Sequence, residues 1–168
     1  NRQYMAKLME SVEDIAAEAI LDGLPWNWTD YGGYLDSVQA LKPALNIVGL
    51  AGHSAIRFEA MGDASMDKDV QADDRQLAEI VRMVKESVEA GAVGFSTSRF
   101  IPHTVPDGRC TPGTWADLRE TGAIQQAVIE AGGVGALFQS ANDFQTRMDT
   151  ELKMFEQGAE LGCQILFS

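Results

Sequence analysis

The stretch EAGAVGFSTSR, residues 89–99, joins a helix end to a short apolar run and then to four polar or charged residues. A glycine at this position is typical of the left-handed residue that ends a helix. The apolar run is typical of a buried strand. In α/β proteins, ligands bind just past the carboxyl ends of parallel strands. Ser96, Ser98 and Arg99 occupy that place, although a plain polar turn would have the same composition.

The same pattern of helix, glycine and apolar strand occurs twice more, as EAGGVGALFQS (130–140) and AELGCQILFS (159–168). Apolar residues recur at helical spacing before each joint, most regularly at Leu77, Ile80, Val81, Val84 and Val88. We predict helices over 73–90, 114–131 and 146–161. The strands that follow them are predicted at 93–97, 134–139 and 164–168.

The first part of the chain is less regular. A helix is predicted over Tyr4–Val12 and another over 29–41, with an irregular stretch between them. The run LNIVGLAG (45–52) is almost continuously apolar, as in a strand that is buried on both faces, and we predict that strand at 45–51. The segments 62–74 and 100–114 are rich in polar residues, glycine and proline and are predicted to be loops.

Alternating helices and strands with tight joints predict parallel strands connected by right-handed crossovers. Two architectures fit this pattern: a (β/α)8 TIM barrel and a doubly wound sheet. A barrel needs about 250 residues, so 168 residues with four strands would be about half of one. No G-x-G-x-x-G follows a strand and no G-x-x-x-x-G-K-[ST] is present, which disfavours the nucleotide-binding doubly wound folds.

Composition narrows the classes of partner. The 13 Lys and Arg against 25 Asp and Glu give a net charge of −12, which would repel nucleic acid. No apolar run reaches the length of a membrane span. The two cysteines, Cys110 and Cys163, form no CxxC pair and are predicted to be free thiols in a cytoplasmic protein. Asn1 and the apolar last residues predict that the chain is a segment of a longer one.

The candidate binding residues lie at the predicted strand ends: His53, Arg57, Ser96, Ser98, Arg99 and Gln139. His53 could ligate a metal, act as a base or hydrogen-bond a loop carbonyl. The serines lie in no G-x-S-x-G elbow, so capping or substrate hydrogen bonds are favoured over a nucleophilic role. The arginines could hold a substrate carboxylate or pair with acidic side chains of the protein.

Metal-ligating residues are scarce. The two histidines and two cysteines fall at none of the HxH, HExxH or CxxC spacings. We therefore assign no metal ligand in this segment, and a hydrolytic metal centre would need ligands from elsewhere in a longer chain.

Six stretches together are similar to the N-acyl-D-amino-acid deacylases, or D-aminoacylases, of the amidohydrolase superfamily. They are VEDI (12–15), LPWNW (24–28), YLDSV (34–38), ALNIVGLAGHSAIR (44–57), GAVGFSTSR (91–99) and DGRCTPGT (107–114). GHSAIR followed some forty residues later by GAVGFSTSR is the more specific part. The resemblance implies that residues 1–168 are the central part of a metal-dependent (β/α)8 barrel whose other parts lie outside the segment.

The resemblance also implies an activity: hydrolysis of the amide of N-acyl-D-amino acids by zinc-activated water and an aspartate. The family's HxH pair, cysteine ligand and catalytic aspartate have no match here, so the catalytic residues are expected outside the segment. Two further histidine ligands would fall at Phe138 or Gln139 and at Phe167 or Ser168, and histidine is at neither place. The segment alone is therefore expected to bind no catalytic zinc and to be inactive. The alternatives are a non-catalytic homologue that binds small molecules and an unrelated doubly wound binding domain.

Half a barrel would have open sheet edges and an uncovered apolar inner face, which seldom stay in water on a monomer. We therefore expect either a homo-oligomer or burial against the remainder of the barrel in a longer chain. The expected ligand is a small N-acylated molecule.

Overall fold

The chain forms a four-stranded parallel sheet that is covered by helices. A computed structural model describes residues 2–132 and 136–168. The strands are β1 (Ala51–Gly52), β2 (Gly94–Ser98), β3 (Leu137–Ala141) and β4 (Gln164–Phe167), and they lie in the order β1-β2-β3-β4. Every neighbouring pair is parallel, as predicted, with Ser96 opposite Gln139 and Gln139 opposite Leu166. Val134 and Gly135 of the third predicted strand lie outside the described residues.

Seven α-helices and one short 3-10 helix are described. They are α1 (Arg2–Glu13), α2 (Ala17–Gly23), α3 (Tyr31–Ala40), α4 (His53–Met61), η1 (Gly62–Met66), α5 (Asp74–Glu89), α6 (Leu118–Glu130) and α7 (Met148–Leu161). The predicted helices at 73–90 and 146–161 are confirmed within two residues. The helix predicted from Thr114 begins four residues later, because the Asp117 side chain accepts the backbone N–H of Glu120 and caps α6 there.

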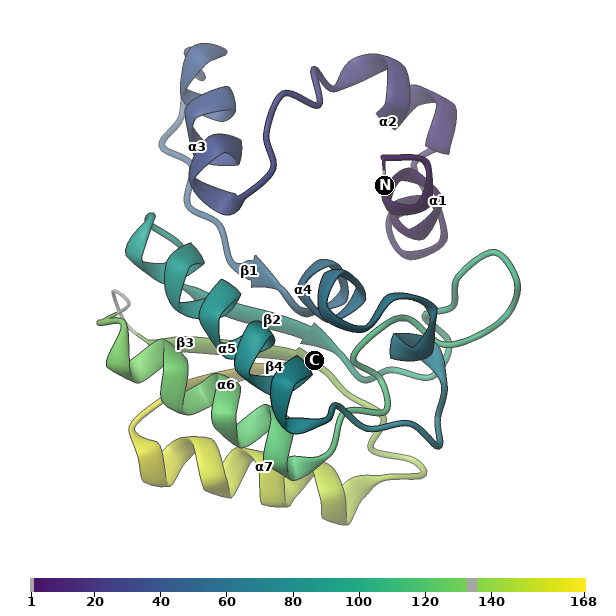
Figure 1. Cartoon of the computed structure of the whole chain (residues 1–168), viewed down its shortest axis with the longest axis vertical. Coiled ribbons are helices and arrows are strands. Elements are labelled where there is room, and N and C mark those ends of the chain that lie inside the picture. The colour runs from purple at the N-terminus through teal and green to yellow at the C-terminus, as the bar shows by residue number, and fades with distance from the viewer. Residues whose placement is uncertain (1, 133–135) are drawn as a thin grey trace.

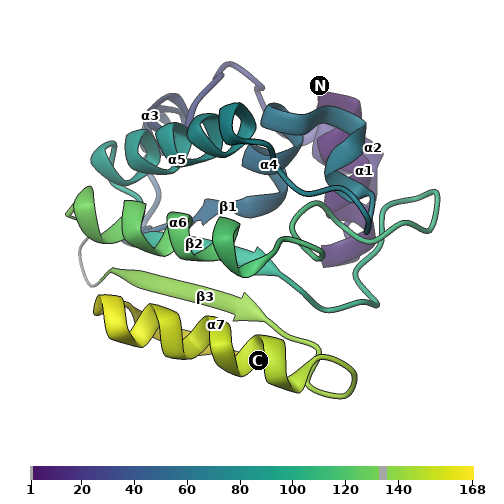
Figure 2. The same cartoon turned by 60° about the horizontal axis from the view of Figure 1, so that its bottom comes forward.

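The helices that pack on the sheet form one layer. Figure 1 shows α5, α6 and α7 side by side across the sheet, and Figure 2 shows the same layer from another direction. One apolar cluster joins them to the strands: it contains Ile80, Val84, Ile124, Val128, Met154 and the strand residues Phe95 and Phe138. A sheet whose strands follow chain order, with right-handed crossovers, places all its connecting helices on the same face. This sequential order is that of singly wound folds and differs from the doubly wound alternative.

The first predicted strand is mostly wrong. Only Ala51 and Gly52 pair with β2, and the prediction that residues 45–51 are buried on both faces is contradicted by the exposed fractions of Leu45 (79%), Ile47 (51%) and Val48 (72%). A strand buried on both faces needs cover on each face and neighbours along its length. Among the described residues, only the last part of this segment lies beside another strand: the Val93 N–H, just before β2, donates to the Gly49 carbonyl.

Two helices were not predicted. The stretch HSAIRFEAM forms α4 directly after β1, so His53 and Arg57 lie in a helix and not in a strand-end loop. The stretch AEAILDG forms α2, where an irregular stretch was expected. The residues before them, Ala16 and Gly52, form no side-chain N-cap hydrogen bond, so the usual start signal is missing from the sequence.

The face of the sheet opposite the helices is more polar than expected. Side chains alternate along a strand, and Phe95 and Phe138 point into the helix layer. Ser96, Ser98 and Gln139, which alternate with them, are half-buried and lie on the other face. The expected apolar inner face is thus interrupted by polar groups at its centre, while Leu166, on the same face at the sheet edge, is 54% exposed.

Cys110 and Cys163 are both free thiols, as predicted. None of the described helices is both long enough and apolar enough to span a membrane.

Candidate functional site

The candidate site is the edge of the sheet at the carboxyl ends of the strands. The segment after β1 (α4 and η1) and the segment after β2 (residues 99–117) both lie beyond this edge, where the arrowheads of β2 and β3 point in Figure 1. Parallel α/β folds bind their ligands here, because the loops that follow the strands can vary without disturbing the sheet.

His53 lies directly behind this edge and is fully buried. Its Nε2 is 2.7 Å from Oε1 of Glu120 in α6, and its Nδ1 is 2.7 Å from the hydroxyl of Thr97 in β2. An ionised carboxylate only accepts hydrogen bonds, so Nε2 carries the ring proton and the Thr97 hydroxyl donates to Nδ1. Both ring nitrogens are therefore occupied by protein side chains. The expected loop carbonyl is not a partner of His53, which hydrogen-bonds a carboxylate and a hydroxyl instead.

Burial lowers the pKa of His53 below its ordinary value, because the surroundings disfavour a charged imidazole more than the Glu120 carboxylate favours it. Burial also opposes the ionisation of Glu120. The hydrogen bonds from His53 and Arg57, together with the charge of the Arg57 guanidinium, outweigh that effect and hold the pKa of Glu120 below its usual value. The cluster at neutral pH therefore consists of a neutral imidazole, an ionised carboxylate and a guanidinium.

Arg57 completes this cluster. Its Nε lies 2.9 and 3.2 Å from the two carboxylate oxygens of Glu120, and its Nη1 donates to the carbonyl of Ser65 in η1. The side chain is fully buried. Pairing with an acidic side chain of the protein, one of the two alternatives for Arg57, is thus the arrangement in the structure. Its predicted contact with a substrate stays a prediction.

Arg99 repeats this arrangement one strand further along. Its Nε lies 2.9 and 3.0 Å from the two carboxylate oxygens of Glu151 in α7, and its Nη1 donates to the carbonyl of Ala116 at 2.8 Å. Asn142, just after β3, donates a further hydrogen bond to Glu151. In both clusters, an arginine in the segment that follows one strand binds a glutamate in the first turn of the helix in the next strand-to-strand connection.

Ser96, Ser98 and Gln139 have a different environment. They lie on the face of the sheet that the helices leave uncovered, near its carboxyl edge, and Ser96 is opposite Gln139 in the β2–β3 register. The Ser98 hydroxyl is 2.6 Å from Nδ1 of His103. The ring of His103 packs edge-on against Phe100, with their centroids 5.3 Å apart. Of the six predicted binding residues, these three can offer hydrogen bonds to a ligand on that face.

The long loop after β2 folds as a hairpin that is anchored to the rest of the protein. Thr104 pairs with Cys110 in an antiparallel bridge, and the Val105 N–H donates to the Arg109 carbonyl at 2.8 Å. Val105 is buried with Leu8 and Met66 in a second small apolar cluster. The hairpin therefore connects α1 with η1.

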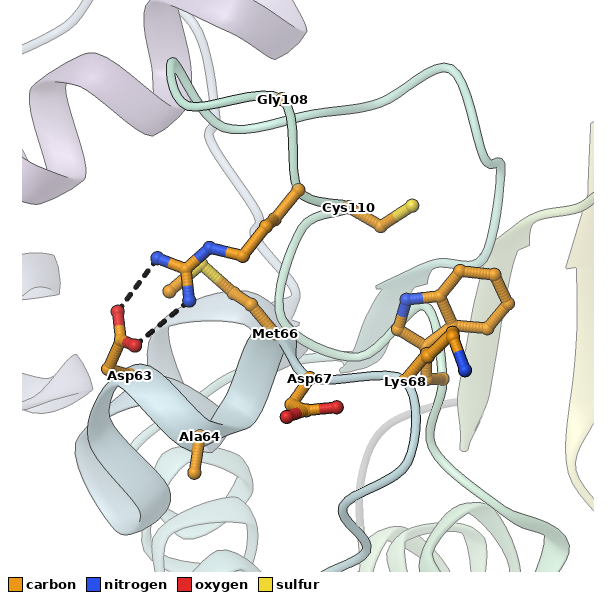
Figure 3. A pocket seen from close by; sticks show the side chains of 9 residues that line it. Asp63, Ala64, Met66, Asp67, Lys68, Gly108 and Cys110 are labelled. Carbon is orange, nitrogen blue, oxygen red and sulfur yellow. Dashed lines mark hydrogen bonds and ion pairs between the residues drawn. The ribbon is translucent and has the colours of Figure 1, made fainter.

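A cavity of about 440 Å³ lies between this hairpin and η1 (Figure 3). The lining consists of η1 and the two residues after it, residues 108–110 of the hairpin, and Trp115. An ion pair closes one side: the Arg109 guanidinium binds both carboxylate oxygens of Asp63, at 2.8 and 2.9 Å. The cavity thus lies between the segment that follows β1 and the segment that follows β2.

The described residues do not form a metal centre. They contain no group of three or more His, Cys, Asp or Glu side chains placed to hold a metal ion. His53 has both ring nitrogens engaged, and Nδ1 of His103 is bound to Ser98. The residues present in the described ranges thus do not fit a zinc site.

Glu120, Glu151 and Thr97 were missed as partners of the predicted residues. The sequence contains a signal for the two glutamates: Glu120 precedes Ile124 by four positions and Glu151 precedes Met154 by three, so both acids fall on the apolar faces of their helices. A charged residue at a core-facing position needs a buried partner. Which arginine or histidine supplies it is decided by the tertiary structure.

Comparison with known sequences gives several relatives but no matching family model. The chain is 29% identical over 151 residues to an uncharacterized protein of Mycobacterium tuberculosis. This alignment covers 85% of this chain and 24% of that protein. It is 35% identical over 82 residues to an N-acyl-D-glutamate deacylase of Alcaligenes xylosoxydans xylosoxydans, covering 49% of this chain and 16% of the relative. The chain thus spans about a quarter or less of the length of these relatives.

Comparison with solved structures also finds deacylases of N-acyl-D-amino acids. The fold matches a D-aminoacylase crystal structure, described as defining a novel subset of amidohydrolases, with a TM-score of 0.63 at 22% identity, over 82% of this chain and 26% of that chain. It also matches an N-acyl-D-glutamate deacylase from Bordetella bronchiseptica, complexed with zinc and a phosphonate inhibitor, with a TM-score of 0.60 at 24% identity, over 81% and 26%. The α/β fold with its parallel four-stranded sheet therefore matches part of a D-aminoacylase fold.

Proposed function

We propose that this chain is the central part of a metal-dependent amidohydrolase that cleaves the amide bond of N-acylated D-amino acids or similar acylated amines. The observation that carries the proposal is the sequential parallel sheet, which matches about a quarter of a D-aminoacylase. The 35% identity to an N-acyl-D-glutamate deacylase over 82 residues supports it independently. In this proposal the sheet continues into a (β/α)8 barrel in the whole protein.

The role of this segment in the reaction would be to bind and orient the substrate. Ser96, Ser98 and Gln139 lie on the uncovered face at the carboxyl edge, and their hydroxyl and amide groups can hydrogen-bond an acyl carbonyl or a carboxylate. His53, Arg57 and Arg99 are buried in ion-pair clusters behind that edge. They would hold the strand ends and loops in place, so that the side chains that contact substrate need little reorganisation.

The zinc that this proposal implies would be held by residues of the whole protein outside this segment, together with the catalytic residues. The described residues of the segment supply no ligand set. We therefore propose that the segment alone is inactive. The second candidate is a non-catalytic homologue that binds acylated small molecules. It is favoured by the lack of histidine at Phe138 or Gln139 and at Phe167 or Ser168, where the family resemblance places metal ligands.

One experiment distinguishes the two candidates. A full-length protein that contains this sequence is incubated with Zn²⁺ and N-acetyl-D-amino acids, and release of the free amino group is measured, with the N-acetyl-L-amino acids as controls. The deacylase proposal expects release from at least one D-substrate and little from its L-enantiomer. Binding of the same compounds without release would instead establish the non-catalytic homologue.

The substrate-binding role is tested in the same protein. Gln139→Ala should raise KM about threefold to tenfold, which corresponds to one lost hydrogen bond of about 0.5–1.5 kcal/mol. Gln145→Ala, an exposed glutamine in the segment after β3, serves as the matched control and should leave KM unchanged. An unchanged KM in both variants would remove Gln139 from the binding site.

We also propose that the remaining barrel strands of the whole protein cover the exposed apolar groups at both sheet edges. Leu45 and Val48 beside β1 and Leu166 and Phe167 of β4 are each more than half exposed. Leaving about 600 Å² of such surface in water forgoes on the order of 15 kcal/mol. Sedimentation of the isolated chain tests this, with self-association or poor folding expected. A well-folded monomer at micromolar concentration would contradict it, and a discrete dimer would identify a second copy as the alternative cover.

A further inference from the structure

The chain has two histidines, and each is bound through its Nδ1 to a hydroxyl of β2. His53 binds Thr97 at 2.7 Å, and His103 binds Ser98 at 2.6 Å. Consecutive side chains of a strand point to opposite faces of the sheet. His53 therefore lies on the side of the helix layer, and His103 lies at the carboxyl edge of the face that the helices leave uncovered.

The two imidazoles differ at their second ring nitrogen. Nε2 of His53 lies 2.7 Å from the Glu120 carboxylate, and that ring is fully buried. Nε2 of His103 forms no hydrogen bond or ion pair with any described residue, and His103 is only half-buried. Because parallel α/β folds bind their ligands at this edge of the sheet, a ligand can reach the second nitrogen of His103.

The surroundings of His103 hold its ring in one orientation. The ring packs edge-on against Phe100, with their centroids 5.3 Å apart and their planes at 86°. The His103 N–H donates to the Phe100 carbonyl at 3.0 Å, and its carbonyl accepts the N–H of the buried Thr111 at 3.1 Å. The Ser98 carbonyl in turn accepts the Thr114 hydroxyl at 3.3 Å. The pair of Ser98 and His103 therefore needs little ordering when a ligand binds.

We propose that Nε2 of His103 donates a hydrogen bond to the carboxylate of the substrate and that Ser98 orients the ring for this contact. The proposal rests on the proposed function, which supplies an N-acyl amino acid as the ligand. A serine hydroxyl can donate to Nδ1, and the ring proton is then on Nε2. The arrangement repeats that of Thr97, His53 and Glu120, with the ligand carboxylate in the place of Glu120. A hydrogen bond to a charged group is about twice as strong as a neutral one, which favours the carboxylate over the acyl carbonyl as the acceptor.

This assignment gives Ser98 a positioning role. Its proton is used by Nδ1 of His103, so Ser98 acts on the ligand through the histidine ring. Ser96 and Gln139, which lie opposite each other in the β2–β3 register, remain the side chains of this face that contact the acyl group directly.

The first test locates the ligand by NMR in a full-length protein that contains this sequence and carries ¹⁵N-labelled histidine. One probe is 4-oxopentanoate, in which a methylene replaces the amide N–H of N-acetylglycine. The other is 2-hexanone, which keeps the ketone but has no carboxylate. The ¹⁵N signals of His103 are assigned through His103→Gln. 4-Oxopentanoate should shift the Nε2 signal saturably, and 2-hexanone should shift it much less.

The second test measures the Kd of 4-oxopentanoate for two variants by isothermal titration calorimetry. The side-chain amide of His103→Asn can replace Nδ1 toward Ser98 but does not reach the position of Nε2, so its Kd should rise about tenfold. The longer amide of His103→Gln can reach that position, and its Kd should rise less than about threefold. Both variants lose the ring contact with Phe100, so their melting temperatures should fall by similar amounts.

Three results would overturn the proposal: no saturable shift of the His103 signal, equal shifts with both probes, or equal Kd values for His103→Asn and His103→Gln. Since the probes have no amide bond, their binding is measured whether or not the protein hydrolyses N-acyl amino acids. Deacylation without a shift of the His103 signal would overturn this proposal alone. Binding at His103 without deacylation would overturn the proposed enzymatic function alone.

Discussion

The Nε of Arg99 lies 2.9 Å from Oε1 of Glu151, which is 52 residues further along the chain, and both side chains are fully buried. Arg57 and Glu120 have the same 2.9 Å separation between the same two atoms across 63 residues. Each pair joins the segment that follows one strand to the first turn of the helix in the next strand-to-strand connection, where the helix dipole also favours a carboxylate. The carboxyl edge of the sheet is therefore held by two charge clusters of the same design.

Removing one partner of such a pair should destabilise the fold strongly. Glu151→Gln leaves the Arg99 guanidinium buried without its counter-charge, and we expect a loss of about 3–5 kcal/mol in the free energy of unfolding. Urea denaturation of a full-length protein that contains this sequence measures this loss. Glu156→Gln, an exposed acid on the same helix, is the control and should change the free energy by less than about 0.5 kcal/mol. Equal effects in the two variants would contradict a structural role for the Arg99–Glu151 pair.

His53 should make the stability depend on pH near neutrality. Its pKa is lowered in the folded protein by burial, so the unfolded chain takes up a proton below pH about 6.5 while the folded protein does not. Since stability then rises with pH, the free energy of unfolding should fall as the pH drops from 7.5 to 5.5. His53→Gln should flatten this slope.

His103→Gln is the control for the pH series, because His103 lies half-buried at the loop and outside the Glu120 cluster. Chemical denaturation at pH 7.5, 6.5 and 5.5 measures the free energy of unfolding of the unaltered protein and of the two histidine variants. Glu120 does not contribute in this window, because its pKa is lowered and its contribution disappears only below its ordinary value of about 4.5. If the pH dependence of the unfolding free energy persists in His53→Gln and disappears in His103→Gln, the titrating group is His103, and the prediction for His53 is contradicted.

The loop after β2 provides a matched pair of glycines. Gly113 and Gly108 both have positive φ angles, 105° and 88°. A Cβ added to Gly113 would lie 2.6 Å from Nδ1 of His53, whereas one added to Gly108 would have no atom within 4 Å. Gly108→Ala should cost about 1 kcal/mol or slightly more for backbone strain alone. Gly113→Ala should cost clearly more, because it also disrupts the hydrogen bonds of His53. Melting temperatures measure both, and equal losses would show that His53 tolerates displacement.

Gly94 and Gly52 form a second pair, in the strands. A Cβ at Gly94 would lie 1.9 Å from the carbonyl oxygen of Leu137, so Gly94→Ala should separate β2 from β3 and prevent cooperative folding. A Cβ at Gly52 meets nothing within 4 Å, and Gly52→Ala should fold normally. Circular dichroism with a thermal scan tests both. A cooperative transition of Gly94→Ala at the same temperature as the unaltered chain would contradict the close approach of β2 and β3.

The sequence alone determined the repeated units of this protein. The apolar spacing of α5 and the glycine joints are local features, encoded within a few residues. They predicted the α5–β2 and α7–β4 units and the parallel order of the strands. The strand-end location of Ser96, Ser98 and Gln139 followed from the same pattern. These predictions succeeded because helix periodicity, capping and strand alternation depend on residues close together in the chain.

Only the tertiary structure decided which side chains act together. Arg57 binds Glu120 across 63 residues, and residues 45–48 are exposed although their sequence is that of a buried strand. The same composition fits a core strand with neighbours and an edge segment without them, and the same arginine fits a substrate carboxylate and a buried glutamate. Burial and ion pairing depend on what the rest of the fold places beside a residue, which no short stretch of sequence contains.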